Sequence, residues 1–521
     1  MSRRLVHGAL VPALLIGAAA PVVIAGTTLA APAGASITKS PGTPFSLSGL
    51  PAESRAPSVA HTPVTSGRTY PRALTTGSVS VGPNINVIGS HDVVQQATIN
   101  GVSVFTCNPG KDTAQNETSI ASNGSTLVGG ANDYRLYEPS ENRYDSSGGF
   151  YRSGNAGGTW TAGFLPGLVR ANTAAPGPYE SAGDPAVSAG PKGTFWYSNI
   201  AFDRTDNANA VAASRSTNGG KTWTTHYVVQ TPAVLGKGTF NDKDWIGASP
   251  TNAKVAYVTW TLFEGASSAI VISKTTDGGL TWSAPRRVSN VFTNDQSSTV
   301  VVGPTGTVYV TFETFNGSTD SVVFAVSTNG GASFTSRQIA TINDIPSPLP
   351  GATFRDNSFP ALAVDGSTLH VVWSNWNGTD ADVVYMRSTD GGATWSSPVT
   401  IGGGAGDQFF PWISARNGIV DASWFNRAGT DDTYTIAGAT STDGGASWST
   451  PVTLSTATSD VLKGNLFGFP NCAASFIGDY NGIVVDSSGV GHALWTDIRN
   501  DSFDPTTGGP DQDPFTATMS G

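Results

Sequence analysis

The chain has 521 residues, of which only 13% are charged, and it contains 62 glycines and 13 tryptophans. Few charges combined with many glycines and aromatic residues are typical of a turn-rich all-β protein. The formal net charge of −10 argues against nucleic acid as a partner, because binding a polyanion requires a basic surface.

Residues 1–35 have the pattern of a secretory signal peptide. Two arginines, Arg3 and Arg4, precede an almost wholly apolar run from Ala9 to Ala30, and Ala33-Gly34-Ala35 offers a cleavage site between small residues. A membrane anchor is the alternative because the run is long, but its prolines and small residues make it a poor spanning helix. We therefore expect a secreted, extracellular protein with no membrane span after the signal is removed.

Residues 36–84 are rich in Pro, Ser, Thr and Gly and show little apolar periodicity, which predicts a flexible linker. Apolar alternation begins at Ile85, and residues 85–521 are predicted to form one domain. The length alone would suggest several domains, but internal repeats indicate a single closed architecture.

An eight-residue motif, called the octet here, occurs six times. The copies are SGNAGGTW from Ser153, STNGGKTW from Ser216, TTDGGLTW from Thr275, STNGGASF from Ser327, STDGGATW from Ser388 and STDGGASW from Ser441. The Asp or Asn accepts backbone hydrogen bonds, the glycines take positive φ and the closing aromatic residue anchors the turn, so each octet predicts a β-hairpin turn. The last five copies lie 52 to 61 residues apart, a spacing that fits one propeller blade.

A second repeat, two strands joined by a short turn, occurs seven times and alternates with the octets. Its copies begin at Glu117, Asp184, Asp244, Asp295, Asp356, Asp407 and Gly478. Each blade would take its inner strands A and B from this repeat and its outer strands C and D from the hairpin that carries the octet. We predict an all-β, seven-bladed β-propeller of four-stranded blades, with six blades as the alternative.

The seventh unit has no octet, and only Asp513 to Met519 remains as a third strand. Its fourth strand must therefore come from elsewhere, and the strand-like segment between Ile85 and Cys107 is the expected donor. A propeller closed by an N-terminal strand has no open sheet edge. The two cysteines, Cys107 and Cys472, would then lie near the closure, and in an exported protein they are candidates for a disulfide.

The octets resemble the Asp box, S-x-D-x-G-x-x-W, of the sialidase-like propeller superfamily, and the resemblance covers roughly residues 85–521. The segments DKDWIG, DQFFPWI, FIGDYNG and WTDIR are similar to secreted bacterial proteins described as sialidase-like or BNR-repeat glycosyl hydrolases. The resemblance implies that the octets lie at the C–D turns, opposite the active-site face. That face would then collect the starts of the A strands and the B–C loops.

An acid stands at or just before the start of nearly every predicted strand A. The set comprises Glu117, Asp184, Asp242, Asp244, Asp295, Asp356, Asp407 and Asp479. If these carboxylates converge, they raise one another's pKa, which suits a general acid. They could equally hold Ca²⁺, although no cofactor is required by this reading, or each acid could cap its own loop.

The family resemblance also implies an arginine triad that binds a substrate carboxylate and a tyrosine nucleophile. Arg355, Arg427 and Arg499 are the candidates for the triad, Tyr480 is the candidate nucleophile, and Arg135 lies in another B–C loop. The first arginine of the family lies in an R-I-P motif, which this chain lacks; its nearest segment is FRDNSFP. This departure puts sialic acid in doubt.

Aromatic residues beside the acids suggest stacking on sugar rings. Trp245, Phe409 and Trp412 are the chosen positions, with blade-to-blade packing as the alternative. The predicted function is a secreted, monomeric carbohydrate-active hydrolase with catalytic residues among Asp184, Asp244, Asp356, Asp407, Asp479 and Tyr480. The alternatives are a non-catalytic propeller that binds glycan or protein at the cell surface, and a scaffold without a site.

Overall fold

The computed structural model describes residues 67–75, 77–88, 98–99, 102–103, 114–138, 143–233, 238–315, 320–462, 466–467, 475–499 and 512–521. All of these residues fall in the compact unit that spans Pro41–Gly521. The predicted signal peptide, Cys107 and Cys472 lie outside the described residues. No helix in the described ranges is long and apolar enough to cross a membrane.

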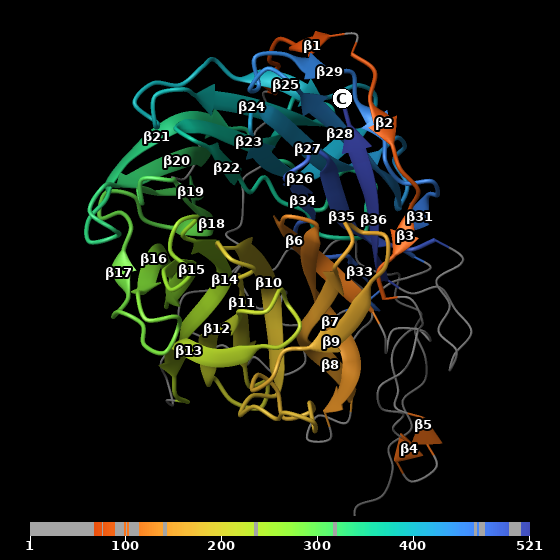
Figure 1. Cartoon of the computed structure of the whole chain (residues 1–521). Coiled ribbons are helices and arrows are strands. Elements are labelled where there is room, and N and C mark those ends of the chain that lie inside the picture. Colours follow the sequence, from red (N-terminus) through yellow and green to blue (C-terminus); the bar gives the residue numbers. More distant parts are fainter. Residues whose placement is uncertain are drawn as a thin grey trace, which may run out of the picture. The chain divides into compact units, whose positions relative to one another are not determined.

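Seven antiparallel sheets form the blades of a ring (Figure 1). Blade 1 contains β6 (Gln115–Asn123), β7 (Thr126–Glu138), β8 (Arg143–Ser153) and β9 (Thr161–Phe164). Blade 2 contains β10 (Ser181–Ala189), β11 (Phe195–Phe202), β12 (Asn209–Ser216) and β13 (Thr224–Thr231). Blade 3 contains β14 (Thr239–Ala248), β15 (Ala256–Glu264), β16 (Ser267–Thr275) and β17 (Arg286–Arg287). Blade 4 contains β18 (Asp295–Val302), β19 (Val308–Phe315), β20 (Asp320–Ser327) and β21 (Thr335–Ile342).

The remaining blades follow the same order. Blade 5 contains β22 (Ala361–Asp365), β23 (Thr368–Trp376), β24 (Ala381–Ser388) and β25 (Val399–Gly402). Blade 6 contains β26 (Asp407–Arg416), β27 (Ile419–Arg427), β28 (Thr433–Ser441) and β30 (Val452–Thr453), with β31 (Ser459–Asp460) also paired to β28. Blade 7 contains β34 (Gly482–Val485), β35 (Gly491–Asp497), β36 (Asp513–Ser520) and the short strands β2 (Ser80–Val81) and β3 (Ile85–Asn86).

Three small pairs stand outside the blades. They are β1 (Leu74–Thr75) with β29 (Trp448–Ser449), β4 (Thr98–Ile99) with β5 (Val102–Ser103), and β32 (Leu466–Phe467) with β33 (Ser475–Phe476). The innermost strands contact one another in the order β6, β10, β14, β18, β22, β26 and β34, and β34 contacts β6 again. The prediction of a seven-bladed propeller is therefore confirmed, and the six-bladed alternative is wrong.

The octets form the turns between the two outer strands of each of the first six blades. In the copy from Ser388, the Ser388 hydroxyl donates to Asp390 (2.7 Å) and accepts from the N–H of Gly392 (2.8 Å). Asp390 also accepts from the N–H of Thr394 (2.8 Å), so one side chain fixes both ends of the turn. The closing Trp395 packs edge-on against Phe324 of the preceding blade, with ring centroids 5.2 Å apart. The octet thus fixes both a turn and the contact between neighbouring blades.

The closing strand comes from the N-terminal side, as predicted, but it starts earlier than Ile85. Residues 67–75 and 77–88, called the N-terminal strap here, cross the outer edges of blades 5, 6 and 7. Thr400 donates to Pro71 O, Trp448 donates to Ala73 O, and β2 and β3 both pair with β36. The sequence analysis placed residues 67–84 in a flexible linker, and this boundary is wrong. The strap pairs through its backbone at sheet edges, so it needs no apolar alternation and gives no periodic signal.

Candidate functional site

The inner strands of five blades share an irregularity near their first residues. The pairing register shifts at Asn116/Ser119, Gly183/Ala186, Asp242/Trp245, Gln296/Thr299 and Phe409/Trp412. Each shift contains one non-glycine residue with φ between +48° and +56°: Glu117, Asp184, Lys243, Ser297 and Phe410. A bulge re-aims the side chains around it, and left-handed backbone at a non-glycine residue costs about 1 kcal/mol or more. Such strain is concentrated at functional sites in proteins, which draws attention to this end of the ring.

The bulges of blades 1, 2 and 3 and the start of blade 7 bring charged side chains together, called the acidic cluster here. The cluster comprises Glu117, Asp184, Asp242, Lys243, Asp244 and Asp479. The N–H of Lys243 donates to Asp184 (2.6 Å), and the N–H of Asp479 donates to Glu117 (3.1 Å). Backbone groups of one blade thus bind carboxylates of the neighbouring blade, and the cluster is held rigidly at the centre of the ring.

Lys243 is the member that the sequence analysis missed. Its side chain is buried, and its Nζ lies 3.2 Å from the centroid of the Tyr480 ring. No hydrogen-bond partner for this ammonium is found among the described residues, so the aromatic face is its closest favourable contact. The signal in the sequence is the segment Asp242-Lys243-Asp244, in which the charges alternate. The bulge of β14 brings all three of these side chains into the acidic cluster.

Three carboxyl groups of the cluster have raised pKa values. Burial raises the pKa of Asp184, against the opposing attraction of Lys243. Burial and then the neighbouring Asp184 raise the pKa of Asp242 and of Asp244 well above the usual range. A carboxyl with a raised pKa stays protonated at higher pH than a free aspartate does, and a proton to give is what a general acid must supply.

Asp479 differs from these carboxyls because it is held in an ion pair. Arg355 donates from Nε and from a terminal nitrogen to the two oxygens of Asp479, at 2.9 and 2.5 Å. Asn357 donates to the backbone carbonyl of Asp479 (3.1 Å), so the connection between blades 4 and 5 reaches across to blade 7. The side chains of Arg355 and Asp479 are 31% and 14% exposed, which makes this pair the more accessible part of the site.

The structure does not bring the three candidate arginines together. Arg427 is fully buried and donates to Asp407 (2.7 Å), to Asp431 O (2.6 Å) and to Pro350 O (2.8 Å). Arg499 donates to both oxygens of Asp497, at 2.8 and 2.7 Å. The prediction of an arginine triad is therefore wrong, because Arg355, Arg427 and Arg499 each pair with a different carboxylate of the chain itself.

Arg135 is occupied in the same way. It donates to both oxygens of Asp133, at 2.9 and 2.7 Å, and it is 5% exposed. Asp133 and Arg135, at the register shift of β7, are separated by one residue, as are Asp497 and Arg499 at the end of β35. The pattern D-x-R in the second strand of a blade would have signalled this local pairing in the sequence.

Tyr480 packs rather than presenting its hydroxyl. The hydroxyl donates to Pro185 O (3.1 Å), and burial raises the pKa of Tyr480 well above its usual value of 10. The ring lies 5.8 Å from that of Trp245 and 6.0 Å from that of Trp412. This geometry does not prepare the phenol as a nucleophile, because a buried phenol resists losing its proton.

Trp245 and Trp412 meet across the ring. Their centroids are 4.4 Å apart, although they come from blades 3 and 6, whose inner strands are not neighbours. Side chains therefore fill the centre of the ring at this level, beside Asp244. Phe409 lies elsewhere: it is fully buried against Phe410 and Phe425, so its predicted contact with a sugar is wrong.

Asp356 and Asp407 also lie outside the acidic cluster. Asp356 accepts from the N–H of Leu349 (2.9 Å), while Asp407 accepts from the N–H of Ala381 (3.0 Å) and pairs with Arg427. Asp356 lies in the connection before β22, whereas Asp407 is the first residue of β26, ahead of the bulge at Phe409/Trp412. Each therefore accepts from backbone at the edge of blade 5 or in the connection before it, and neither lies at a bulge. For these two positions, the capping alternative describes the contacts better than a catalytic role.

Asp295 of blade 4 gives a test of stability against pH. Burial raises its pKa to about 7, and neither oxygen has a hydrogen-bond partner among the described residues. A raised folded-state pKa stabilises below the unfolded value, about 3.9, and this contribution is lost as pH rises toward 7. In the wild type, this group should lower the free energy of unfolding by up to about 4 kcal/mol between pH 4 and pH 7. Asp295→Asn has no titrating carboxyl at this position, so the variant should lack this decrease. Urea unfolding at several pH values measures this, and parallel curves for wild type and variant would contradict it.

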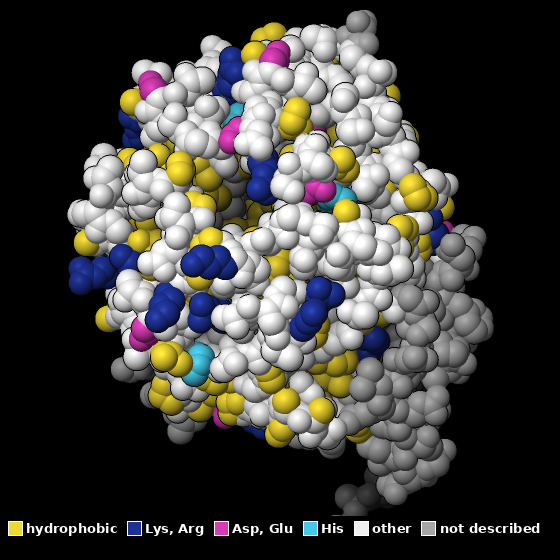
Figure 2. Space-filling view, in the orientation of Figure 1, with side chains coloured by type: hydrophobic (Ala, Val, Ile, Leu, Met, Phe, Trp, Pro, Cys, Tyr) yellow, Lys and Arg dark blue, Asp and Glu magenta, His cyan; other side chains and the backbone are white. Residues whose placement is uncertain are grey.

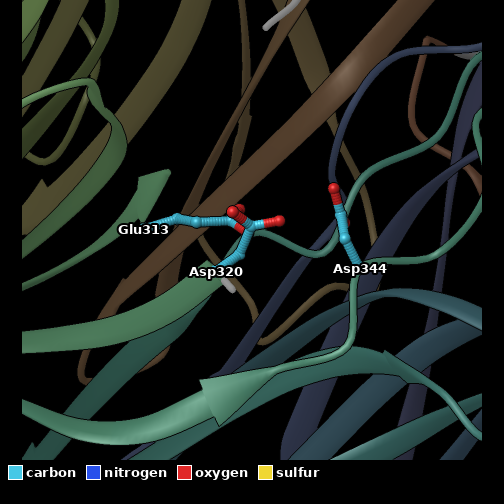
Figure 3. Close-up of side chains that lie close together, drawn as sticks. All are labelled: Glu313, Asp320 and Asp344. Carbon is cyan, nitrogen blue, oxygen red and sulfur yellow. The ribbon is translucent and has the colours of Figure 1, made fainter. Parts of the chain in front are cut away.

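One group of three acids in the described part of the chain has oxygens within 4.8 Å of one another: Glu313, Asp320 and Asp344. All three are buried, and all belong to blade 4 or to the connection that leaves it. Figure 3 shows the carboxylates of Glu313 and Asp320 side by side, with Asp344 approaching from that connection. Carboxylate oxygens suit a hard cation such as Ca²⁺. The donor type therefore fits here better than in the acidic cluster, where no such group of three is found.

These observations define a seven-bladed β-propeller with an acidic cluster at the starts of its inner strands, in which burial raises the pKa of Asp184, Asp242 and Asp244. No protein-family description matches the chain, and no curated protein matches it.

Solved structures similar to the chain include glycosidases. An α-L-arabinanase of Penicillium chrysogenum is 13% identical, covers 84% of this chain and 98% of its own, and has a TM-score of 0.41. The phage phi92 endosialidase is 10% identical, covers 79% and 68%, and has a TM-score of 0.43. The intramolecular trans-sialidase of Ruminococcus gnavus is 12% identical, covers 79% and 97%, and has a TM-score of 0.37. Because these identities and TM-scores are low, the fold is assigned from the sheet topology of the chain itself.

Proposed function

We propose that the protein is a secreted carbohydrate-active hydrolase that cleaves glycosidic bonds at the acidic cluster. The observation that carries this proposal is the division of the carboxyl groups into two kinds. Asp184, Asp242 and Asp244 have raised pKa values through burial, whereas Asp479 is held in an ion pair by Arg355. Glycoside hydrolysis needs both kinds: a protonated carboxyl for the leaving oxygen and an ionised one as base or nucleophile.

An uncharged sugar suits this site better than sialic acid. Arg135, Arg427 and Arg499 are occupied by Asp133, Asp407 and Asp497, and Arg355 already binds Asp479 on both oxygens. A substrate carboxylate would have to displace Asp479 and would then lie near further carboxyl groups. We propose export because residues 1–35 resemble a secretory signal peptide, and we propose that the protein acts on glycans outside the cell as a monomer.

The proposal is tested by a hydrolysis screen of residues 36–521 on aryl glycosides, including a sialoside, and on polysaccharides, with and without Ca²⁺. We expect Asp184→Asn to lower kcat/KM on a confirmed substrate by about 100-fold or more, since it removes a proton donor. Asp356→Asn is the matched control, because it changes a buried aspartate outside the cluster and should leave turnover nearly intact.

Full turnover by Asp184→Asn would contradict the proposed role of the cluster. Binding of glycan without hydrolysis across the screen would favour the alternative, a non-catalytic propeller that binds glycan or protein at the cell surface. If Ca²⁺ stimulates hydrolysis by the wild type but not by Asp320→Asn, a cation binds at Glu313, Asp320 and Asp344 of blade 4.

A further inference from the structure

A basic residue directly precedes the octet in four of the six blades that carry one. Arg152, Arg215, Lys274 and Arg387 occupy this position. Each donates to a backbone carbonyl of the following blade: Gly219 O at 2.6 Å, Ala253 O at 3.0 Å, Gly330 O at 3.3 Å and Gly444 O at 2.7 Å, respectively. Each of these basic side chains therefore bridges two neighbouring blades. The bridges lie on the face of the ring that carries the octets, called the octet face here, opposite the acidic cluster.

Lys274 is the exception in this series, because it is the only lysine and makes the longest of the four hydrogen bonds. An ammonium on a flexible chain lacks the broad planar fork of a guanidinium. A pocket of about 160 Å³ remains open between blades 3 and 4 at this point. Tyr257, Lys274, Ser283, Arg286 and Gly330 are among the residues that line it.

The polar side chains of the lining can all donate hydrogen bonds, and none of the lining side chains is a carboxylate. Arg286 is exposed, and its guanidinium makes no ion pair or hydrogen bond within the described ranges, whereas the adjacent Arg287 pairs with Glu264 at 3.5 Å. Lys274 lies 5.3 Å from the centroid of the Tyr257 ring, and both the Lys274 ammonium and the Tyr257 hydroxyl lie in the space that a side chain at position 330 would enter. Figure 2 shows Lys and Arg side chains gathered over β13 to β17, in the lower left of the view, on a protein whose net charge is negative.

We propose that this pocket binds one tetrahedral oxyanion, a sulfate or phosphate group, either free or as a substituent of a glycan. Two cations and a phenolic hydroxyl supply donors for such a group, and the volume is of the size of one small anion with its waters. The site is independent of the acidic cluster, so glycan hydrolysis and anion binding can fail separately. It would hold an anionic polymer or surface against the octet face while the opposite face remains free.

The test measures binding of a fluorescein-labelled sulfated dextran oligosaccharide by anisotropy at constant ionic strength. We expect Arg286→Ala and Lys274→Ala each to weaken the apparent Kd about 10-fold, and Lys274→Arg to weaken it by filling the pocket. Lys192→Ala and Lys221→Ala are matched controls, because both lysines are exposed on the octet face and neither lines the pocket. Arg286→Ala removes no ion pair or side-chain hydrogen bond among the described residues, so the folding of the variant should be unaffected, and thermal unfolding checks this.

Inorganic sulfate and phosphate should displace the oligosaccharide, while sodium chloride at equal ionic strength and unsulfated dextran should not. Binding of the free ions as tightly as the oligosaccharide would assign a site for a free anion. Tighter binding of the oligosaccharide would assign a site for an anionic substituent. Equal weakening by the control variants, or no binding by the wild type, would overturn the proposal.

Discussion

A chain that begins after Ile88 is expected to lose most of the stability of the propeller, whereas a chain that begins at Gly67 should keep it. The N-terminal strap supplies the outer strands of blade 7, with Gly82 donating to Thr518 O (2.9 Å) and Val87 donating to Pro514 O (3.0 Å). Val87 and Ile88 also pack in a core cluster with residues of blades 1 and 7. At about 1 kcal/mol per hydrogen bond, with the apolar burial added, we expect a loss of roughly 5 kcal/mol or more.

Thermal unfolding and limited proteolysis measure this effect, because β36 would become an unpaired edge after the deletion. A point variant tests the same contact more gently. Asn84 donates to Leu454 O (2.8 Å) and accepts from the N–H of Thr456 (2.6 Å) and from Arg499 (2.8 Å). Asn84→Ala should cost about 2 to 3 kcal/mol, and exposed Ser80→Ala should cost little. Equal stability of the full and shortened chains would refute a closing role for the strap.

Arg427→Ala is expected to destabilise the protein by about 3 to 5 kcal/mol, because it leaves the buried Asp407 without its cation. The two residues face each other directly across the pair of β26 and β27. The double variant with Asp407→Asn should recover part of the loss, since the uncompensated charge is then removed. Chemical denaturation measures both values.

Arg355→Ala is the matched comparison for Arg427→Ala. Its side chain is 31% exposed, and its ion pair with Asp479 is partly solvated. We expect a smaller loss of stability than for Arg427→Ala and a larger loss of glycan binding or turnover. Wild-type stability in Arg427→Ala, together with lost binding, would restore this arginine to a substrate site.

The blades could be predicted from the sequence because their signals are local. An octet contains its own turn chemistry and its own anchor: Asp390 closes the turn and Trp395 packs on the neighbouring blade. The seven-fold count followed from the alternation of two repeats. The third strand of blade 7 was also predicted, because β36 covers the expected Asp513 to Met519.

The partners of the arginines could not be predicted from residue type, because a guanidinium can bind any carboxylate that the fold places beside it. For Arg427 that carboxylate is Asp407, a cross-strand neighbour, and for Arg499 it is Asp497, two residues away. Lys243 was missed for a related reason. Only the bulge in β14 makes an isolated lysine part of the same site as Asp184.

The bulges have a further consequence for how this repeat can diversify. A strand with one extra residue behaves as two short strands joined end to end, because the extra residue reverses which side chains face each side of the sheet. Beyond the bulge, side chains such as Ile246 belong to the packed blade, whereas before and within it Asp242 and Lys243 point to the acidic cluster. Mutations in the leading segment therefore change the chemistry at the centre of the ring without repacking the blades. The bulge position can therefore carry an acid in one blade (Asp184), a lysine in the next (Lys243) and an aromatic residue in another (Phe410).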